Sequence, residues 1–332
     1  MEKLLTVVIP TYNIQNYIGT CLESFCIPEI MDKIEVLVIN DGSKDKSANI
    51  VSKYVKQYPN TFILINKENG GHGSTINTAI PIAKGKYFKV VDGDDWVEKK
   101  AFLNLVLFLE NQDSDIVATN YYWVDEQSKK RKIEFRHPFS NVIYKKQYQM
   151  KEISGKAFIK MHSMSIKTEI LRRAKVKLDE HCYYVDVEYI MLPIPYVKTV
   201  IFLDEFVYMY RIGLETQSMN PSNMRRNLEH HEKVFERMLN EYKKYEQNGD
   251  ITTLNYYNIG LGRMLTSWFK IILSFPPTKY SKQILKNYDN RILLQYPNIY
   301  YAVTNKAVWL LRNTNYKLYY LASLALRIKE RK

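Results

Sequence analysis

The sequence predicts an α/β protein in which a mainly parallel, twisted sheet with flanking helices is followed by a mostly helical C-terminal region. Two observations lead to this prediction. In the first part of the 332-residue chain, short β-rich apolar runs alternate with helix-length amphipathic segments, the pattern of a parallel sheet covered on both faces. From about residue 220 onward, apolar residues recur at helical spacing instead. We therefore expect two domains, 1–220 and 221–332.

The expected elements of the first domain alternate regularly. Strands are predicted near residues 6–9, 35–39, 62–65, 87–91 and 115–119, and helices near 16–27, 45–57, 74–83 and 98–110. In open α/β sheets the ligand binds in the crevice beyond the carboxyl ends of the strands. Functional residues should therefore follow the strands directly.

A run of acidic residues ends the fourth expected strand. Asp92, Asp94 and Asp95 follow Val91 and project three carboxylates from a turn. Hard cations such as Mg²⁺ and Mn²⁺ take oxygen ligands, and Mg²⁺ is usually held by one or two carboxylates together with substrate phosphates. The turn is therefore suited to hold a divalent cation against a diphosphate. An ordinary acidic turn is the alternative interpretation of this motif taken alone.

Small, polar and acidic residues also follow the other three strands. They form the segments PTYN (10–13), NDGS (40–43) and NKENGGHG (66–73). Each segment alone is typical of a turn or a helix cap. Their common position at one edge of the sheet favours a shared binding site.

Four segments, 8–13, 40–45, 68–71 and 91–95, resemble the ordered motif set of family 2 glycosyltransferases, which have the GT-A fold. The resemblance extends over roughly residues 4 to 215. It implies that Asp41 contacts the nucleoside, Asp92 contacts the nucleotide sugar, and Asp94 coordinates the Mn²⁺ or Mg²⁺ that bridges the diphosphate. The donor-binding residues that we expect are Pro10, Thr11, Tyr12, Asp41, Asn69, Gly70, His72, Asp92, Gly93, Asp94, Arg211 and Ser218.

Residues 178–189 resemble the region that leads to the family's catalytic Asp. An inverting transfer needs a general base that takes the proton from the acceptor hydroxyl. We expect Asp186 in this role, although Val185 stands where the family usually has Glu. Glu188 is the alternative, and Asp186 could also cap the helix that follows. Asp179 and Glu180 are expected to face solvent.

Two further positions differ from, or extend, the family pattern. Ile76 stands before Asn77 where many members carry Arg, so His72 is expected either to supply a donor contact or to be a surface-loop histidine. Residues 208–218 resemble the family's end-of-domain stretch, in which an Arg and a Ser on a mobile loop close over the diphosphate. Arg211 at a surface helix start is the alternative.

Positive charge is concentrated in the later part of the chain. The formal net charge is +13, with 19 Lys and Arg against 18 Asp and Glu in residues 1–150, and 29 against 17 in residues 151–332. This asymmetry favours an anionic partner. Helices are predicted over 224–245, 251–275 and parts of 280–332, with a break at Pro276 and Pro277.

The last segment, 316–332, is apolar with a basic end. It is expected either to lie on an anionic membrane surface or to pack on the domain or on a second subunit of a homo-oligomer. The basic run 129–132 is expected in an exposed hairpin turn, not in a nucleic-acid site.

Composition also bears on location. Three cysteines are too few for a disulfide framework, and the first apolar run stops at Pro10, too early for a signal peptide. No run reaches the 18 apolar residues of a membrane span. We expect a cytoplasmic protein, with a peripheral position at the inner face of the plasma membrane as the second option.

Together these features predict a metal-dependent inverting glycosyltransferase that moves one hexosyl or N-acetylhexosaminyl residue from a nucleoside diphosphate sugar to an acceptor hydroxyl. We expect the donor to be a UDP-sugar. The acceptor would be a glycan, lipid-linked or polyanionic molecule in surface polysaccharide, teichoic acid or glycoprotein assembly. No tryptophan follows an Arg, so the Gln-x-x-Arg-Trp motif of processive members is missing. A nucleotidyltransferase and a non-catalytic partner subunit are the alternatives.

Overall fold

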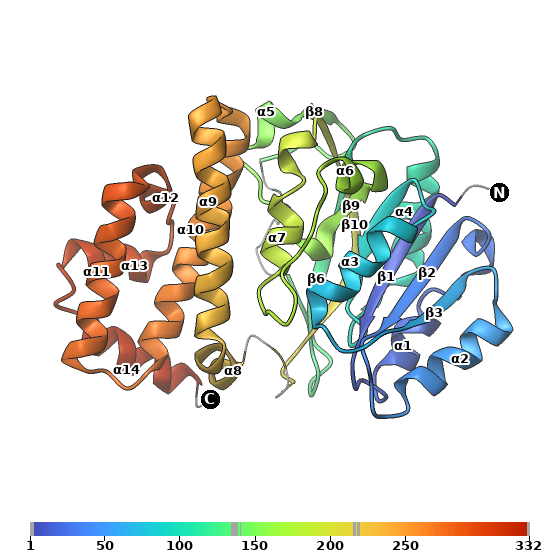
Figure 1. The fold of residues 1–332 in the computed structure, drawn as a ribbon, viewed down its shortest axis with the longest axis horizontal. Coiled ribbons are helices and arrows are strands. Elements are labelled where there is room, and N and C mark those ends of the chain that lie inside the picture. Colours follow the sequence, from blue (N-terminus) through green and yellow to red (C-terminus); the bar gives the residue numbers. More distant parts are fainter. Residues whose placement is uncertain (1–2, 134–138, 140, 215–216, 218–219, 331–332) are drawn as a thin grey trace. The chain divides into compact units, whose positions relative to one another are not determined.

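The structure is a computed structural model that describes residues 3–133, 139, 141–214, 217 and 220–330. Its contacts divide the chain into two compact units, Met1–Leu214 and Glu215–Lys332. The first unit is a sheet flanked by helices and the second is helical (Figure 1). The division falls close to the boundary expected from the change of periodicity.

A mixed sheet, ten-stranded within the described residues, forms the centre of the first unit. Its main path runs in the order β3-β2-β1-β4-β9-β6-β10-β5, while β7 pairs with β6 and β8 pairs with β10. The strands are β1 (Leu5–Thr11), β2 (Ile34–Asn40), β3 (Phe62–Asn66), β4 (Tyr87–Val90), β5 (Trp96–Val97), β6 (Ile116–Asp125), β7 (Arg131–Lys132), β8 (Gln147–Gln149), β9 (Met164–Lys167) and β10 (Thr199–Ile212).

Helices connect and cover these strands. The α-helices of the first unit are α1 (Ile18–Glu23), α2 (Ser47–Gln57), α3 (His72–Ile82), α4 (Lys99–Glu110), α5 (Met150–Ile153), α6 (Thr168–Arg173) and α7 (Asp186–Met191). Three short 3₁₀ helices are η1 (Pro28–Ile30), η2 (Met161–Ser163) and η3 (Ile194–Tyr196).

The central strands are apolar throughout because both faces of the sheet are covered. Alternate side chains of β1 and β2 pack with α1 and α4 in one core cluster, while α3 contacts the same two strands from the other side. Every residue of β2 is buried. β1 pairs in parallel with β2 and β4, and β2 pairs in parallel with β3. The predicted α/β class is therefore confirmed, and all five expected strands are present.

Four strands, β5, β8, β9 and β10, were not expected from the sequence. β9 is inserted between β4 and β6 and runs antiparallel to both. β10 is 14 residues long and pairs in parallel with β6, with register shifts between Leu203 and Tyr208. The basic run near residue 130 does form a hairpin, because Val124 of β6 pairs antiparallel with Arg131 of β7.

The second unit is helical in its described residues. It contains α8 (Pro221–Arg226), α9 (Leu228–Asn248), α10 (Ile251–Ser274), α11 (Lys279–Gln295), α12 (Pro297–Tyr301), α13 (Lys306–Asn313) and α14 (Tyr319–Glu330). A left-handed Gly249 ends α9, and the Asp250 side chain caps α10 by accepting from the Thr253 N–H. The two prolines fall between α10 and α11, as predicted.

A buried carboxylate joins the later helices. Asp289 of α11 is 0% exposed and accepts from the Arg312 guanidinium of α13 at 2.7 and 2.9 Å. The Tyr316 hydroxyl donates to the same carboxylate. Because removing one partner would leave a buried charge uncompensated, this group locks α13 onto α11.

Candidate functional site

The carboxyl ends of the first three strands lie side by side. Thr11 of β1 is in register with Asn40 of β2, and Asn40 is in register with Asn66 of β3. The Asn40 side chain also donates to the Asn66 side chain at 2.8 Å. The loops that follow these strands therefore start at one level, as the sequence predicts for a binding edge.

Asp41 organises the loop after β3. It is 2% exposed, and both carboxylate oxygens accept hydrogen bonds. The donors, at 2.8 to 3.3 Å, are Lys67 Nζ, Asn69 Nδ2, the Gly70 and Gly71 N–H groups and Ser74 Oγ. With its oxygens so occupied, Asp41 positions Asn69 and Gly70 in this structure, and a direct contact with a nucleoside would require one of these donors to move.

The acidic turn lies after β4, next to β10. Asp95 is 1% exposed, and its two oxygens accept from the Tyr208 hydroxyl at 2.6 Å and from the Arg211 N–H at 2.7 Å. The Tyr208 hydroxyl in turn accepts from the Asp92 N–H at 3.1 Å. Tyr208 therefore ties both ends of the turn to the sheet. Gly93 lies between them, and a Cβ there would come within 2.9 Å of the Pro10 carbonyl oxygen.

Negative charge accumulates on this turn. Burial, together with the Asp92 charge, raises the pKa of Asp94 to about 6. Burial and the neighbouring Asp94 and Asp92 charges raise the pKa of Asp95 well above its usual range. Within the described residues, the Asp94 carboxylate accepts a hydrogen bond from its own backbone N–H and from no other residue. A cation bound here would relieve this repulsion.

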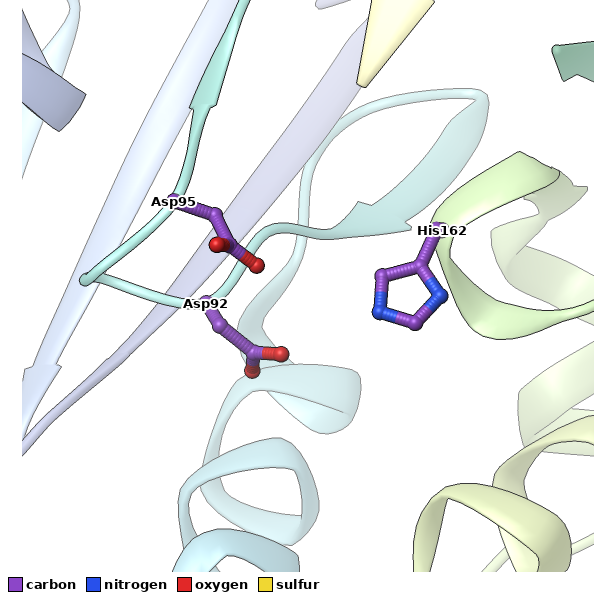
Figure 2. A group of neighbouring side chains, drawn as sticks. All are labelled: Asp92, Asp95 and His162. Atoms are coloured by element: carbon purple, nitrogen blue, oxygen red, sulfur yellow. The ribbon is translucent and has the colours of Figure 1, made fainter. Parts of the chain in front are cut away.

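The residues of the turn fit a divalent cation. Figure 2 shows Asp92 and Asp95 next to each other with the ring of His162 facing them, and one ligand atom of each lies within 4.8 Å of the others. Asp95 already uses both oxygens in buried hydrogen bonds, so it serves as a support. Asp92 and Asp94, which are half-buried, offer the accessible oxygens. Hard oxygen donors of this kind suit Mn²⁺ or Mg²⁺.

His72 is the first residue of α3 and faces the acidic turn. Its Nε2 donates to Asp92 Oδ1 at 2.8 Å, since a carboxylate can only accept. Burial lowers the His72 pKa, but the charge and hydrogen bond of Asp92, together with the charges of Asp186 and Asp94, outweigh this effect, and the net shift is upward. His72 therefore contacts the acidic turn from the start of α3 and does not lie in a surface loop, which was the alternative.

The segment before Asp186 docks on α3 and on the loop after β3, next to the acidic turn. Asn77 of α3 accepts from the Leu178 N–H at 2.8 Å and donates to the Leu178 carbonyl at 2.9 Å. The His181 N–H donates to the Gly70 carbonyl at 2.6 Å. Asn77 thus has a docking role in this chain, although Ile76 stands where many relatives have Arg.

Asp186 opens α7 and interacts with the site. Burial raises its pKa, and the charges of His72 and Asp92 act on it in opposite directions. Val185 is the N-cap residue of α7, but the Asp186 carboxylate accepts from the Val187 N–H in the first turn, so Asp186 also satisfies a donor at this helix end. Glu188 is 0% exposed and accepts from the Asp179 N–H at 2.8 Å, which makes it a poor alternative base. Glu180 is exposed, as expected, and Asp179 is half-buried.

Arg211 differs from both expected positions. It lies inside β10 and is 6% exposed, with its guanidinium between the Tyr17 and Trp96 rings at 4.8 and 4.7 Å. It also pairs with Glu126 and donates from Nε to the Asp94 carbonyl at 2.7 Å. Neither a mobile loop nor a surface helix start holds this residue, because the unexpected strand β10 extends through it.

The remaining predicted donor residues are in two settings. Thr11 is 1% exposed and hydrogen-bonds the Ile9 carbonyl, whereas Tyr12 is 48% exposed at the same edge. Pro10 lies within β1. Ser218 lies outside the described residues.

Three residues that lie beside the acidic turn were not among the residues predicted for the site. Tyr208 and His162 come from β10 and η2, and Lys89 lies in β4 with 0% exposure. Lys89 donates to the His162 carbonyl at 2.8 Å and so holds η2 behind the acidic turn. A lysine within an otherwise apolar strand was the one available signal.

Comparison with known proteins connects this geometry to a family. The sequence profile described as Glycosyl transferase family 2 matches residues 6–174. Glycosyltransferase GlyA of Streptococcus pneumoniae serotype 4 is 28% identical over 64% of this chain, and the minor teichoic acid biosynthesis protein GgaB of Bacillus subtilis is 25% identical over 73%. The matches span 31% and 27% of the length of these relatives, so the chain covers about a third of them or less.

A solved structure shows the same fold. S. aureus TarS residues 1–349, crystallised with UDP-GlcNAc, superpose with a TM-score of 0.59 over 98% of this chain and 89% of that chain. Sequence identity is 18%, so the likeness concerns the fold. It confirms the predicted GT-A type of sheet followed by a helical region.

Proposed function

The chain belongs to glycosyl transferase family 2, and on that premise we propose that it transfers one sugar from a nucleoside diphosphate sugar to an acceptor hydroxyl with inversion. The observation that carries the proposal is the convergence of two kinds of carboxylate. Asp92 and Asp94 lie on the turn after β4, and Asp186 interacts electrostatically with Asp92 and His72. A cation ligand set beside a separate basic carboxylate suits glycosyl transfer to a hydroxyl.

On the donor side, we assign the nucleotide to the loops after β1, β2 and β3. Tyr12 offers an exposed ring at this edge, and Asn69 and Gly70 are held in place by Asp41. UDP is the proposed nucleotide, because the similar TarS structure was crystallised with UDP-GlcNAc. A hexosyl or N-acetylhexosaminyl group is the proposed sugar.

Asp92 and Asp94 would hold Mn²⁺ or Mg²⁺. When bound, such an ion supplies Lewis-acid stabilisation of the charge that develops on the departing diphosphate. His72 holds the Asp92 carboxylate in place through its 2.8 Å hydrogen bond. Arg211 supports the turn, since its Nε donates to the Asp94 carbonyl and its backbone N–H donates to the Asp95 carboxylate.

We assign Asp186 as the general base. A carboxylate whose pKa is raised by burial is a better proton acceptor, which is what abstraction of a hydroxyl proton requires. The acceptor hydroxyl must attack the anomeric carbon from the face opposite the leaving diphosphate, so the base must lie on that face, beside the hydroxyl. The hydrogen bonds between α3 and Leu178 restrict the position of the segment that leads to Asp186.

We infer the class of acceptor from the positive charge of the later part of the chain. Residues 151–332 carry 29 Lys and Arg against 17 Asp and Glu, which favours a polyanionic or lipid-linked glycan acceptor. Similarity to GgaB supports a role in teichoic acid or surface polysaccharide assembly, one sugar per encounter. Cys21, Cys26 and Cys182 are all free thiols, which supports a cytoplasmic location.

A thermal-shift panel tests the donor site. UDP, GDP, CDP and dTDP are each added with and without Mn²⁺ to the wild type, Asp94→Asn and the control Asp32→Asn, whose exposed carboxylate precedes β2 at the opposite edge. A ligand at 100 times its Kd stabilises by about 2.7 kcal/mol. We expect a Mn²⁺-dependent shift for one nucleotide in the wild type and the control, and its loss in Asp94→Asn.

Product analysis completes the test. Release of nucleoside diphosphate together with a β-configured product from an α-linked donor supports an inverting glycosyltransferase. Release of pyrophosphate would identify a nucleotidyltransferase instead. No shift with any nucleotide, and no release, would favour a non-catalytic subunit.

A further inference from the structure

The last helix, α14, exposes an apolar face. The exposed side chains among those described in this helix are all apolar or aromatic. Their helical spacing places them on one stripe. We call this set the α14 face: Tyr320, Leu321, Leu324, Ala325 and Ile328. Tyr320, Leu321, Leu324 and Ile328 are 42%, 64%, 54% and 50% exposed. A soluble surface helix usually places charged residues here.

The opposite side of α14 is anchored, so the helix cannot rotate to hide this face. Tyr319 is 0% exposed and its hydroxyl donates to Ser281 Oγ of α11 at 2.8 Å. Ser323 is also 0% exposed and donates to the Leu273 carbonyl of α10 at 2.8 Å. Figure 1 shows α14 beside the end of α10. The α14 face is therefore directed outward from its own unit.

The later part of the second unit, which includes α14, carries mostly positive charge. Residues 251–332 contain 13 Lys and Arg but only two acidic residues, Asp289 and Glu330. Asp289 is buried and engaged by Arg312. Lys282 places its ammonium 5.8 Å from the Tyr320 ring, and Lys317 is exposed just before the helix. The apolar stripe is thus bordered by cations that few acidic groups neutralise.

We propose that the α14 face binds the surface of an anionic phospholipid bilayer. Leu321, Leu324 and Ile328 would enter the boundary between headgroups and acyl chains, and Tyr320 would lie at headgroup level, where tyrosine is enriched. The basic side chains would meet the anionic headgroups. The contact is peripheral, since none of the described helices is long and apolar enough to cross a bilayer.

Charge decides between a bilayer and a second copy of this chain. Pairing two α14 faces would bring two strongly basic surfaces together, and like charges oppose such association. An anionic bilayer offers both an apolar layer and compensating charge. This surface would hold the enzyme where a lipid-linked acceptor is found, which extends the proposed function without resting on it.

Vesicle flotation with the full chain tests the proposal. The probes are vesicles of phosphatidylcholine alone and of phosphatidylcholine mixed with phosphatidylglycerol. The test variant is Leu321→Glu/Leu324→Glu, and the matched control is Ile251→Glu/Leu294→Glu, which places the same charges on two other exposed apolar residues (69% and 82% exposed) of the same unit. Circular dichroism and the melting temperature confirm that both variants fold.

We expect the wild type and the control to float with the phosphatidylglycerol vesicles, less so at high salt, and not with phosphatidylcholine alone. The α14 variant should bind at least about tenfold more weakly, because it loses apolar insertion and gains repulsion. Equal binding to both vesicle types, or unchanged binding of the α14 variant, would overturn the proposal. A wild-type dimer in light scattering that the α14 variant abolishes, with no flotation, would instead identify a second copy as the partner. The assay needs no donor, so its failure leaves the catalytic proposal intact.

Discussion

The hydroxyl of Tyr208 connects the acidic turn to the sheet. The substitution Tyr208→Phe removes this hydroxyl and no other atom of the side chain. The phenyl ring remains, so no cavity forms. Two short hydrogen bonds are lost, one donated to the buried Asp95 carboxylate at 2.6 Å and one accepted from the Asp92 N–H at 3.1 Å, together with a longer contact to Asp92 Oδ2 at 3.4 Å. Burial keeps solvent from replacing the lost partner of Asp95, because Asp95 is 1% exposed and Tyr208 is 0% exposed.

The two bonds set the size of the effect. A hydrogen bond to a charged group contributes about 1.5 to 3 kcal/mol and a neutral one about 0.5 to 1.5 kcal/mol. We therefore expect Tyr208→Phe to destabilise the first unit by about 3 kcal/mol. In a unit of this size, that corresponds to a decrease in melting temperature of about 6 to 12 °C. Because Tyr208 supports the proposed metal ligands, Mn²⁺-dependent nucleotide binding should also weaken by about 10- to 100-fold.

Differential scanning fluorimetry and calorimetric titration of UDP with Mn²⁺ measure the two effects. The control is Tyr210→Phe, the same change two residues along the same face of β10, where the hydroxyl makes no hydrogen bond within the described chain. If Tyr208→Phe changes the melting temperature and the nucleotide affinity no more than Tyr210→Phe does, the hydroxyl does not hold the turn, and our account of Asp95 as a support is wrong.

Three further predictions concern other parts of the site. Asp186→Asn should leave nucleotide binding unchanged but lower kcat by about 10² to 10⁴, the usual contribution of a general base; full activity in a turnover assay would refute the assignment. Burial lowers the Lys89 pKa to about 7 from 10.5, so the unfolded chain binds the extra proton between these values and stability should rise with pH across this window. Urea unfolding at several pH values should show a smaller rise in Lys89→Met, and an unchanged slope would argue against a neutral lysine. Gly73→Ala should lower kcat, because its Cβ would collide with the Asp179 carbonyl in the segment that positions Asp186, whereas Gly19→Ala, with open space around its Cβ, should remain fully active; equal activity of the two variants would contradict this docking.

Much of the first unit follows from local sequence. β1 and β2 are apolar runs that end at polar loops, and such a run can be buried on both sides only in a sheet covered by helices. The acidic turn and the loop around Asp41 were both visible for the same reason, since each motif lies within a few consecutive residues. The role of Asp41 in holding this loop could not be predicted, because its five donors lie more than 20 residues away in the chain.

What the sequence by itself determined is therefore the α/β class, the edge where the loops gather, and the carboxylates on the turn after β4. Tertiary structure alone decided which groups surround them. Tyr208 reaches Asp95 across 113 residues of chain, Lys89 reaches the His162 carbonyl across 73, and Arg211 is buried because β10 extends through it. Local periodicity reports which face of an element is buried, but it carries no information on which distant strand will pair with it. The partners of a site residue are set by that pairing.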